Sequence, residues 1–383
     1  MSFQQHSLWN NLYVMHDLPR DLAQSVSVNS CFRIEDENLE NFPSTIHHLS
    51  ICIRKLNLSK LMKFWDLSRC KKLHILLFIY GYGPYHQFAH DVLLKELSSI
   101  RVMDLGYLCM DELPTSIGYC KQLRYLDISH TKIIRFSETL CSHYDLQVLK
   151  LKPCLNVCFP RGMRKLINLR KLDANENSIA EIAEIGNLTS LQELNLFNVT
   201  KEISHMIREL CNMSQLHGKL CIKNLGSVDT KLEACQAMLI RKRHLNALCF
   251  KWISDWHAVL RCNESDADVL AGLQPHPNLK ELKIISYGGV RYPRWLDASF
   301  TPKSGEFFLG NCKSLEQFPS LGQWPFLKVL RFGSMNAVRC VGHLFSGTAE
   351  SDFPALEKTC VLEYASVGRV VCSKWKPIIS LPV

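Results

Sequence analysis

The sequence has few of the features that mark membrane or secreted proteins. Its apolar residues never form a run of 18 or more, and the stretch 73–80 is only as long as a strand, which argues against a membrane-spanning helix. Its first twenty residues do not combine a basic start with an apolar block, so we expect no secretory signal. We therefore expect a cytoplasmic protein without a membrane span.

The 17 cysteines lack the arrangement of a disulfide framework or of a metal site. Their number is odd, they are scattered, and no Cys-x-x-Cys pair occurs. Most of them stand beside leucines, where a reduced thiol behaves as a small apolar side chain. These observations predict a reducing compartment and no bound metal ion.

Sequence motifs of catalysis are also missing. The chain contains neither Gly-x-Ser-x-Gly nor His-Glu-x-x-His, and it has no phosphate-binding loop of the form Gly-x4-Gly-Lys-Ser/Thr. We therefore expect a protein that is not an enzyme and has no cofactor of its own.

Leucine and basic charge are abundant instead. The 383 residues include 56 leucines and carry a net charge of +9, and residues 121–245 hold 19 Lys and Arg against 12 Asp and Glu. This stretch contains a candidate basic docking patch: Arg161, Arg164, Lys165, Arg170 and Lys171. Such a patch can meet an acidic protein surface, or it can be a solvated flank. No aromatic residues interleave it, so we expect no nucleic-acid partner.

The phrase Leu-x-x-Leu-x-Leu, or a close variant, recurs along the chain. Six copies begin at residues 73, 100, 123, 146, 169 and 191, with steps of 27, 23, 23, 23 and 22 residues. Looser copies follow at 217–222, 245–250, 279–284 and 327–332, and the long last step leaves room for a degenerate copy at 307–309. Near-constant spacing of this kind predicts a leucine-rich-repeat array.

Each copy of the phrase predicts one short strand. Its fourth and sixth positions alternate onto the same face of the strand and point inward, and no repeat can bury its apolar face without its neighbours. The predicted fold is therefore α/β: a leucine-rich-repeat solenoid (horseshoe) with a parallel concave sheet and an irregular or helical convex side.

The same alternation predicts which residues form the exposed concave face. They occupy the third, fifth and seventh positions of the phrases and form a candidate interaction surface: Tyr125, Asp127, Lys150, Lys171, Asp173, Glu193, Asn195, Lys251, Glu281, Lys283 and Arg331. A ribbon of charged and aromatic side chains suits recognition of a protein partner. A sheet with one solvated face must, however, be polar there in any case.

Ahead of the repeats, the chain carries Met15, His16 and Asp17. Asp17 can cap a helix, provided that Pro19 falls in its first turn. This motif, with Asp-Leu-Ala at 21–23, resembles the signature that closes the nucleotide-binding module of plant nucleotide-binding, leucine-rich-repeat disease-resistance proteins of the coiled-coil class. The repeats at 113–133 and 216–225 are similar to that family's cytoplasmic repeats, and the resemblance covers about residues 12–358.

The resemblance implies a function in plant defence. In that family the repeat region recognises a pathogen effector or a guarded host protein and holds the nucleotide switch closed. His16 matches the histidine that approaches the phosphates of bound ADP. Because the phosphate-binding loop is missing, we expect ADP or ATP only if a nucleotide-binding module were present, and that module is itself an expected partner.

The resemblance also implies a division of the chain. Residues 1–28 correspond to the C-terminal stub of the nucleotide-binding and winged-helix module, 29–72 to a linker and degenerate first repeats, 73–358 to the repeat array, and 359–383 to a divergent tail. The chain is then a truncated receptor. The alternative is a leucine-rich-repeat adaptor or scaffold, such as a ubiquitin-ligase substrate receptor, unrelated to nucleotide switching.

Overall fold

The computed structural model describes residues 4–5, 13–14, 16–27, 30–35, 46–52, 71–79, 94–108, 110–154, 157–252, 264–296, 305–317, 319, 321, 324–333, 335, 337 and 355–362. The chain divides into two compact units. Unit 1 comprises Met1–Pro160 with Asp173–Asn175, and unit 2 comprises Arg161–Leu172 with Glu176–Val383. Among the helices described, none has the length and apolar character needed to cross a membrane.

The first parallel sheet contains seven strands in chain order. They are β3 (Cys31–Ile34), β4 (His48–Cys52), β5 (Ile75–Ile79), β6 (Val102–Asp104), β7 (Tyr125–Asp127), β8 (Val148–Lys150) and β9 (Lys171–Asp173). Successive strands from β3 to β8 pair in parallel, and residues one repeat apart are direct neighbours, as Val102, Tyr125 and Val148 show. Strands β3 and β4 lie ahead of the first phrase recognised in the sequence.

The second parallel sheet also contains seven strands in chain order. They are β10 (Leu196–Asn198), β11 (Gly218–Lys223), β12 (Leu245–Lys251), β13 (Glu281–Ile285), β14 (Glu306–Gly310), β15 (Val329–Gly333) and β16 (Lys358–Leu362). All neighbouring pairs are parallel. Strand β16 crosses the boundary between residues 358 and 359 that was drawn from the repeats.

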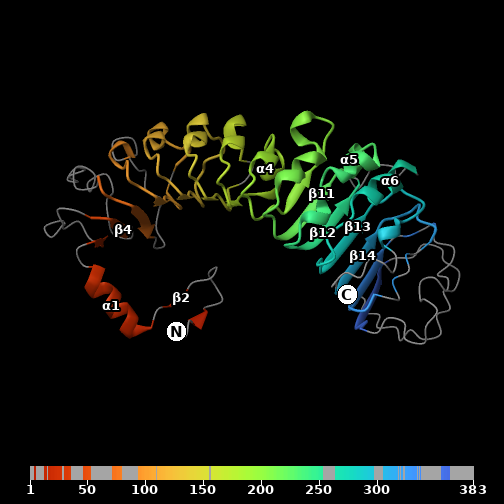
Figure 1. Cartoon of the computed structure of the whole chain (residues 1–383). Coiled ribbons are helices and arrows are strands. Elements are labelled where there is room, and N and C mark those ends of the chain that lie inside the picture. Colours follow the sequence, from red (N-terminus) through yellow and green to blue (C-terminus); the bar gives the residue numbers. More distant parts are fainter. Residues whose placement is uncertain are drawn as a thin grey trace. The chain divides into compact units, whose positions relative to one another are not determined.

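Short helices form most of the connections between the strands, and within each unit they lie on the side opposite the sheet (Figure 1). The 3-10 helices are η2 (Thr115–Tyr119), η3 (Glu138–Ser142), η4 (Arg161–Lys165), η5 (Ile185–Asn187), η6 (Ile203–His205), η7 (Ile207–Asn212), η8 (Leu225–Ser227), η9 (Leu239–Arg241) and η10 (Arg294–Leu296). The α-helices in this position are α4 (Glu176–Ala180), α5 (Lys231–Cys235) and α6 (Glu264–Gly272). The predicted parallel sheet with an irregular, partly helical opposite side is confirmed.

The leucines of the repeated phrase form the core of each unit. In unit 1, Leu146, Leu149 and Leu151 are buried at the first, fourth and sixth positions. Each such side chain contributes roughly 1.5–3 kcal/mol by leaving water. In unit 2 the degenerate copy expected at 307–309 is present as β14, with Phe307 and Leu309 buried. The inward positions that the phrase predicts are therefore confirmed.

The segment before the first sheet contains α1 (Asp17–Ser27) and a short antiparallel pair, β1 (Gln4–Gln5) with β2 (Tyr13–Val14). The helix begins at Asp17, and Pro19 lies in its first turn, as the sequence required. Its apolar residues Leu18, Leu22 and Val26 are 77%, 65% and 75% exposed. Because they are four residues apart, they form one apolar stripe along the helix.

A histidine is enclosed in the core of unit 1. His143 follows η3 and is fully buried, and its backbone oxygen accepts a hydrogen bond from the Leu146 N–H at 3.0 Å. Burial lowers the pKa of His143 to about 4, and the nearby charge of Lys121 acts in the same direction. The buried ring is therefore neutral at physiological pH.

We predict that acid destabilises the protein through His143. The unfolded chain takes up a proton below a pKa of about 6.5, whereas the folded chain does so only near pH 4, so stability is lost as pH falls through this window. The loss is at most roughly 3 kcal/mol, about 1.4 kcal/mol per pH unit. Urea unfolding followed by circular dichroism between pH 7.5 and 4 measures it. His143→Leu should flatten this dependence, and exposed His244→Leu should not; equal curves for all three proteins would contradict the prediction.

Candidate interaction surface

Three of the predicted surface residues meet on the sheet of unit 1. The Tyr125 hydroxyl donates a hydrogen bond to Asp127 Oδ2 at 3.2 Å. Lys150 Nζ lies 3.6 Å from the same oxygen and 5.3 Å from the centre of the Tyr125 ring. The three side chains come from adjacent strands and are half-buried, so they form one preorganised polar cluster.

Asp104 adds a second carboxylate to this cluster. It is the direct neighbour of Asp127 across β6 and β7. Burial, together with the negative charge of Asp127, raises the pKa of Asp104 to about 6. The sequence contained a signal for it, because Asp104 stands at the fifth, outward position of the copy that begins at 100, but it was not among the predicted residues.

Asp173, another predicted residue of unit 1, forms its own ion pair. Its Oδ1 lies 3.0 Å from Lys152 Nζ, and its backbone oxygen accepts a hydrogen bond from the Leu151 N–H at 2.8 Å. Lys152 lies two residues beyond Lys150, in the turn that leaves β8. Asp173 is therefore held at the end of the sheet rather than inside the tyrosine cluster.

In unit 2, Nζ of the predicted Lys171 lies 3.6 Å from Oε2 of the predicted Glu193. His217, which was not predicted, lies 4.0 Å from the other oxygen of Glu193. The exposed Glu193 therefore stands between two basic groups, of which His217 is charged only when protonated. In the second sheet, Arg331 of β15 lies 4.0 Å from Glu306 of β14.

A shallow hollow of about 250 Å³ opens on the polar face of the second sheet. It brings together the predicted Asn195, Glu281 and Lys283. Its lining also includes residues that are not in the predicted set: Glu176, Lys219, Leu220, Cys221, Ala247, Leu248 and Cys249. The predicted Lys251, at the end of β12, is half-buried and does not line it.

The hollow exists because the middle strand carries small outward side chains. Ala247 lies between Lys219 of β11 and Glu281 of β13 in the strand register. Lys219 Nζ approaches Glu281 Oε2 to 3.8 Å, and Lys283 forms an ion pair with the other oxygen of Glu281. Long charged side chains thus surround a floor made of a methyl group and thiols.

The predicted basic docking patch is divided between two sides of a repeat. Arg161, Arg164 and Lys165 lie exposed on η4, in the connection to β9, whereas Lys171 is on β9 and points to Glu193. Arg170 is exposed in the turn between them. The structure therefore brings the three residues of η4 together but places Lys171 with the polar face of the sheet.

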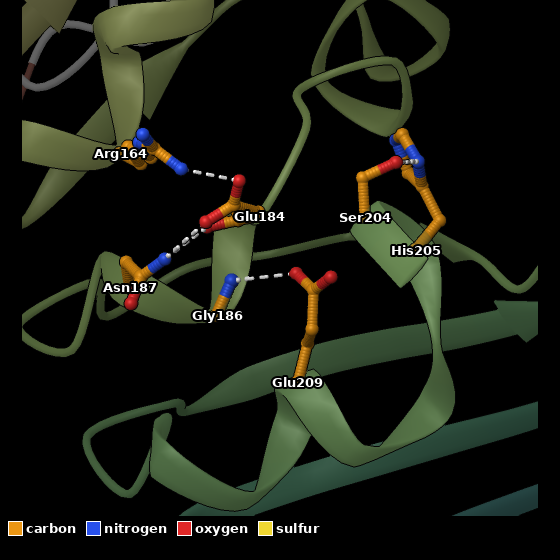
Figure 2. A network of polar contacts seen from close by, with 7 residues as sticks. All are labelled: Arg164, Glu184, Gly186, Asn187, Ser204, His205 and Glu209. Atoms are coloured by element: carbon orange, nitrogen blue, oxygen red, sulfur yellow. Dashed lines mark hydrogen bonds and ion pairs between the residues drawn. The ribbon is translucent and has the colours of Figure 1, made fainter. Parts of the chain in front are cut away.

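Arg164 is also part of a local polar network (Figure 2). Its guanidinium donates to Glu184, which accepts a further hydrogen bond from the Asn187 side-chain amide at 3.3 Å. The hydrogen bond from Arg164 lowers the pKa of Glu184. Beside it, the Gly186 N–H donates to Glu209 Oε2 at 3.0 Å (Figure 2). This network joins η4, η5 and η7, so Arg164 is engaged within the chain.

The described residues of the motif at the start of α1 lie at the surface. His16 and Asp17 are exposed, and Asp17 forms an ion pair with Arg20 at 3.5 Å. Met15 lies outside the described residues. Within the described part of the chain, no three His, Cys, Asp or Glu side chains are grouped so that they could hold a metal ion.

The parallel sheets, the repeat of about 23 residues and the buried leucine phrase define a leucine-rich-repeat protein. The family model "R13L1/DRL21 LRRs" matches residues 207–335. Matching solved structures include the leucine-rich repeat domain of APL1B, at 12% identity and a TM-score of 0.49, covering 94% of this chain and 96% of that chain. The leucine-rich-repeat protein LIC12759 of Leptospira interrogans matches at 14% identity and a TM-score of 0.41, covering 76% and 85%.

Within this class, the chain corresponds to the leucine-rich-repeat portion of plant disease resistance proteins. It is 33% identical to disease resistance protein At3g14460 of Arabidopsis thaliana over 96% of this chain and 26% of that protein. It is 31% identical to disease resistance RPP13-like protein 1 of Arabidopsis thaliana (87% and 33%) and 28% identical to disease resistance protein RGA1 of Solanum bulbocastanum (94% and 35%). The chain thus spans between a quarter and about a third of the length of these relatives.

We predict that Glu209 makes unit 2 less stable as pH rises. Burial, together with the negative charge of Glu184, raises its pKa to about 7. The protonated carboxyl makes its full contribution to the free energy of unfolding below about pH 4.5, the pKa of this group in the unfolded chain. That contribution is lost as pH rises through 7. Glu209→Gln keeps an acceptor for the Gly186 N–H and removes the charge. At pH 8 the free energy of unfolding of Glu209→Gln should exceed that of the unmodified chain by on the order of 1 kcal/mol, a figure that allows for the partial exposure of the Glu209 side chain.

Urea titrations at pH 5 and pH 8 measure this difference, with exposed Glu202→Gln as the control. A gain for Glu209→Gln that does not grow between these two pH values would show that the carboxyl is ionised in the folded protein at both.

Proposed function

We propose that the chain is the recognition region of a plant intracellular immune receptor and binds a protein through the polar faces of its sheets. The observation that carries the proposal is the ordered polar cluster of Tyr125, Asp127 and Lys150, built on a fold whose relatives are disease resistance proteins. Stability of the sheet requires only that these positions be solvated. It does not require an aromatic ring, an acid and a base in mutual contact.

The cluster has the properties of a protein-binding hot spot. Tyrosine supplies a large apolar surface with a polar tip and little side-chain entropy, and it is enriched where binding energy concentrates. Asp127 and Lys150 already face each other, so the cost of ordering them is met within the free protein. Their charges supply specificity and orientation more than raw affinity. The partner expected here is a pathogen effector or a guarded host protein.

A second surface on the connecting side fits contact with a nucleotide-binding module. Arg161 and Lys165 are exposed on η4 and carry positive charge away from the polar face. In unit 1, the apolar stripe of α1 is a separate exposed surface, which suits packing against a neighbouring module. In this proposal His16 serves the nucleotide switch only when that module, with its ADP or ATP, is joined to the chain or supplied in trans.

We predict that charge reversal on η4 weakens this docking. The double variant Arg161→Glu, Lys165→Glu should bind a nucleotide-binding module of a plant resistance receptor, supplied in trans, about tenfold more weakly, because two attractive pairs become repulsive. Tenfold corresponds to about 1.4 kcal/mol. Co-purification and titration calorimetry measure the change. The matched control is Lys132→Glu with Lys231→Glu, two exposed lysines elsewhere. If both double variants bind the module with equal affinity, η4 is not part of the interface.

We predict that Tyr125→Ala and Lys150→Ala abolish recognition without unfolding the chain. Both side chains are half-buried on the exposed face, so the core leucines stay packed. Proteins that co-purify from infected leaf tissue with the unmodified chain are compared with those retained by each variant and by Lys132→Ala. A specific partner should be lost from both cluster variants and kept by the control. A partner retained by all variants would place recognition elsewhere.

A further inference from the structure

Two cysteines face each other on the polar face of the second sheet. Cys221 of β11 and Cys249 of β12 are direct neighbours in the strand register. Both occupy outward positions, both are half-buried, and both line the hollow described above. In the described part of the chain, no other two cysteines are paired in the strand register.

The spacing of the strands permits a bond between the two sulfurs. Neighbouring strands lie about 4.8 Å apart, and disulfides span Cα separations of roughly 4.4–6.8 Å. Both thiols are free in this structure. By contrast, buried Cys312 belongs to the core, where its thiol donates to the backbone oxygen of Gly310 at 3.4 Å. The pair in the hollow is therefore open to a small reagent, whereas Cys312 is not.

The two thiols are electrostatically unequal. A hydrogen bond from Cys249 lowers the pKa of Cys221, and the charges of Lys223 and Lys251 act in the same direction against the effect of burial. The same hydrogen bond, together with burial, raises the pKa of Cys249. A lowered pKa increases the fraction of thiolate, which is the nucleophilic form of cysteine. Cys221 thus has the properties of an attacking thiol and Cys249 those of a resolving thiol.

We propose that Cys221 and Cys249 are a reversible oxidation site, at which a peroxide converts the thiol pair into a disulfide across β11 and β12. The site differs from the protein-binding cluster in unit 1 and does not depend on it. The side chains on the floor of the hollow are small and leave room for hydrogen peroxide. The volume of the hollow, about 250 Å³, is several times the roughly 30 Å³ that a water molecule occupies.

The reaction balances in two steps. The Cys221 thiolate attacks one peroxide oxygen, so that an S–O bond forms as the O–O bond breaks, and the departing hydroxide takes up a proton to give water. Cys249 then loses its proton and attacks the sulfur of the Cys221 sulfenic acid. The S–S bond forms as the S–O bond breaks, and the second hydroxide leaves with that proton as water. Two thiols are oxidised and one peroxide is reduced; a dithiol reductant reverses the change by exchange.

The first test uses the unmodified chain. The reduced protein is treated with stoichiometric hydrogen peroxide, sampled over time, alkylated with N-ethylmaleimide and digested without reduction for peptide mass spectrometry. We expect a peptide that joins Cys221 to Cys249 to form at least tenfold faster than oxidation of the exposed Cys211 and Cys235, and to disappear with dithiothreitol. Absence of the joined peptide, or equal rates at all four cysteines, would overturn the proposal.

Two serine variants test the assigned roles. Cys249→Ser should accumulate a sulfenic acid on Cys221 that dimedone labels, and Cys221→Ser should lose the fast reaction. Cys235→Ser, the matched control, should form the disulfide at the original rate. Dimedone labelling of Cys249 in Cys221→Ser at the rate seen for Cys221 would contradict the assigned order of attack. Circular dichroism spectra establish that each variant is folded.

Discussion

Parallel pairing between successive repeats is the constraint on which the rest of the structure depends. A strand of three to seven residues has too little apolar surface to be stable alone, and it becomes stable only when the next repeat covers its two inward side chains. The burial of these side chains fixes the register of the strands. A slip of one residue would expose Leu149 and Leu151 and bury Lys150. The leucine excess of the sequence is a direct consequence.

The same register determines the chemistry of the exposed face. Outward residues one repeat apart become neighbours about 4.8 Å apart, so a like-charged pair must be separated, neutralised or protonated. Asp104 and Asp127 are such a pair, and they are accommodated by Lys150 on the next strand and by the raised pKa of Asp104. In the second sheet Glu281 is placed between Lys219 and Lys283. The polar face is therefore a set of rows in which each residue's charge state depends on its neighbours.

The sequence predicts the elements of the fold that depend on local periodicity. Repeat spacing, inward leucines and most strand positions follow from the phrase, because each is set within a few residues. The copy that begins at 191 is the exception, because its strand β10 starts only at Leu196. Features that depend on two repeats at once could not be predicted in this way. The hollow arises where Ala247 of one repeat meets Lys219 and Glu281 of two others. A register shift beside Gly218, which has a φ of +77°, also helps to set this alignment, and the phrase does not reveal it.

The predicted basic docking patch shows that charged residues close together in the sequence need not share one surface. Arg164 and Lys171 are seven residues apart and look like one cluster in the sequence. A 3-10 turn followed by a strand reverses the direction in which side chains point. Arg164 therefore pairs with Glu184 on the connecting side, whereas Lys171 of β9 pairs with Glu193. Surfaces of a repeat protein are therefore assembled across repeats rather than along them. Any partner that reads the polar face contacts residues separated by about 23 positions, and substitutions in one repeat can change it without disturbing the next.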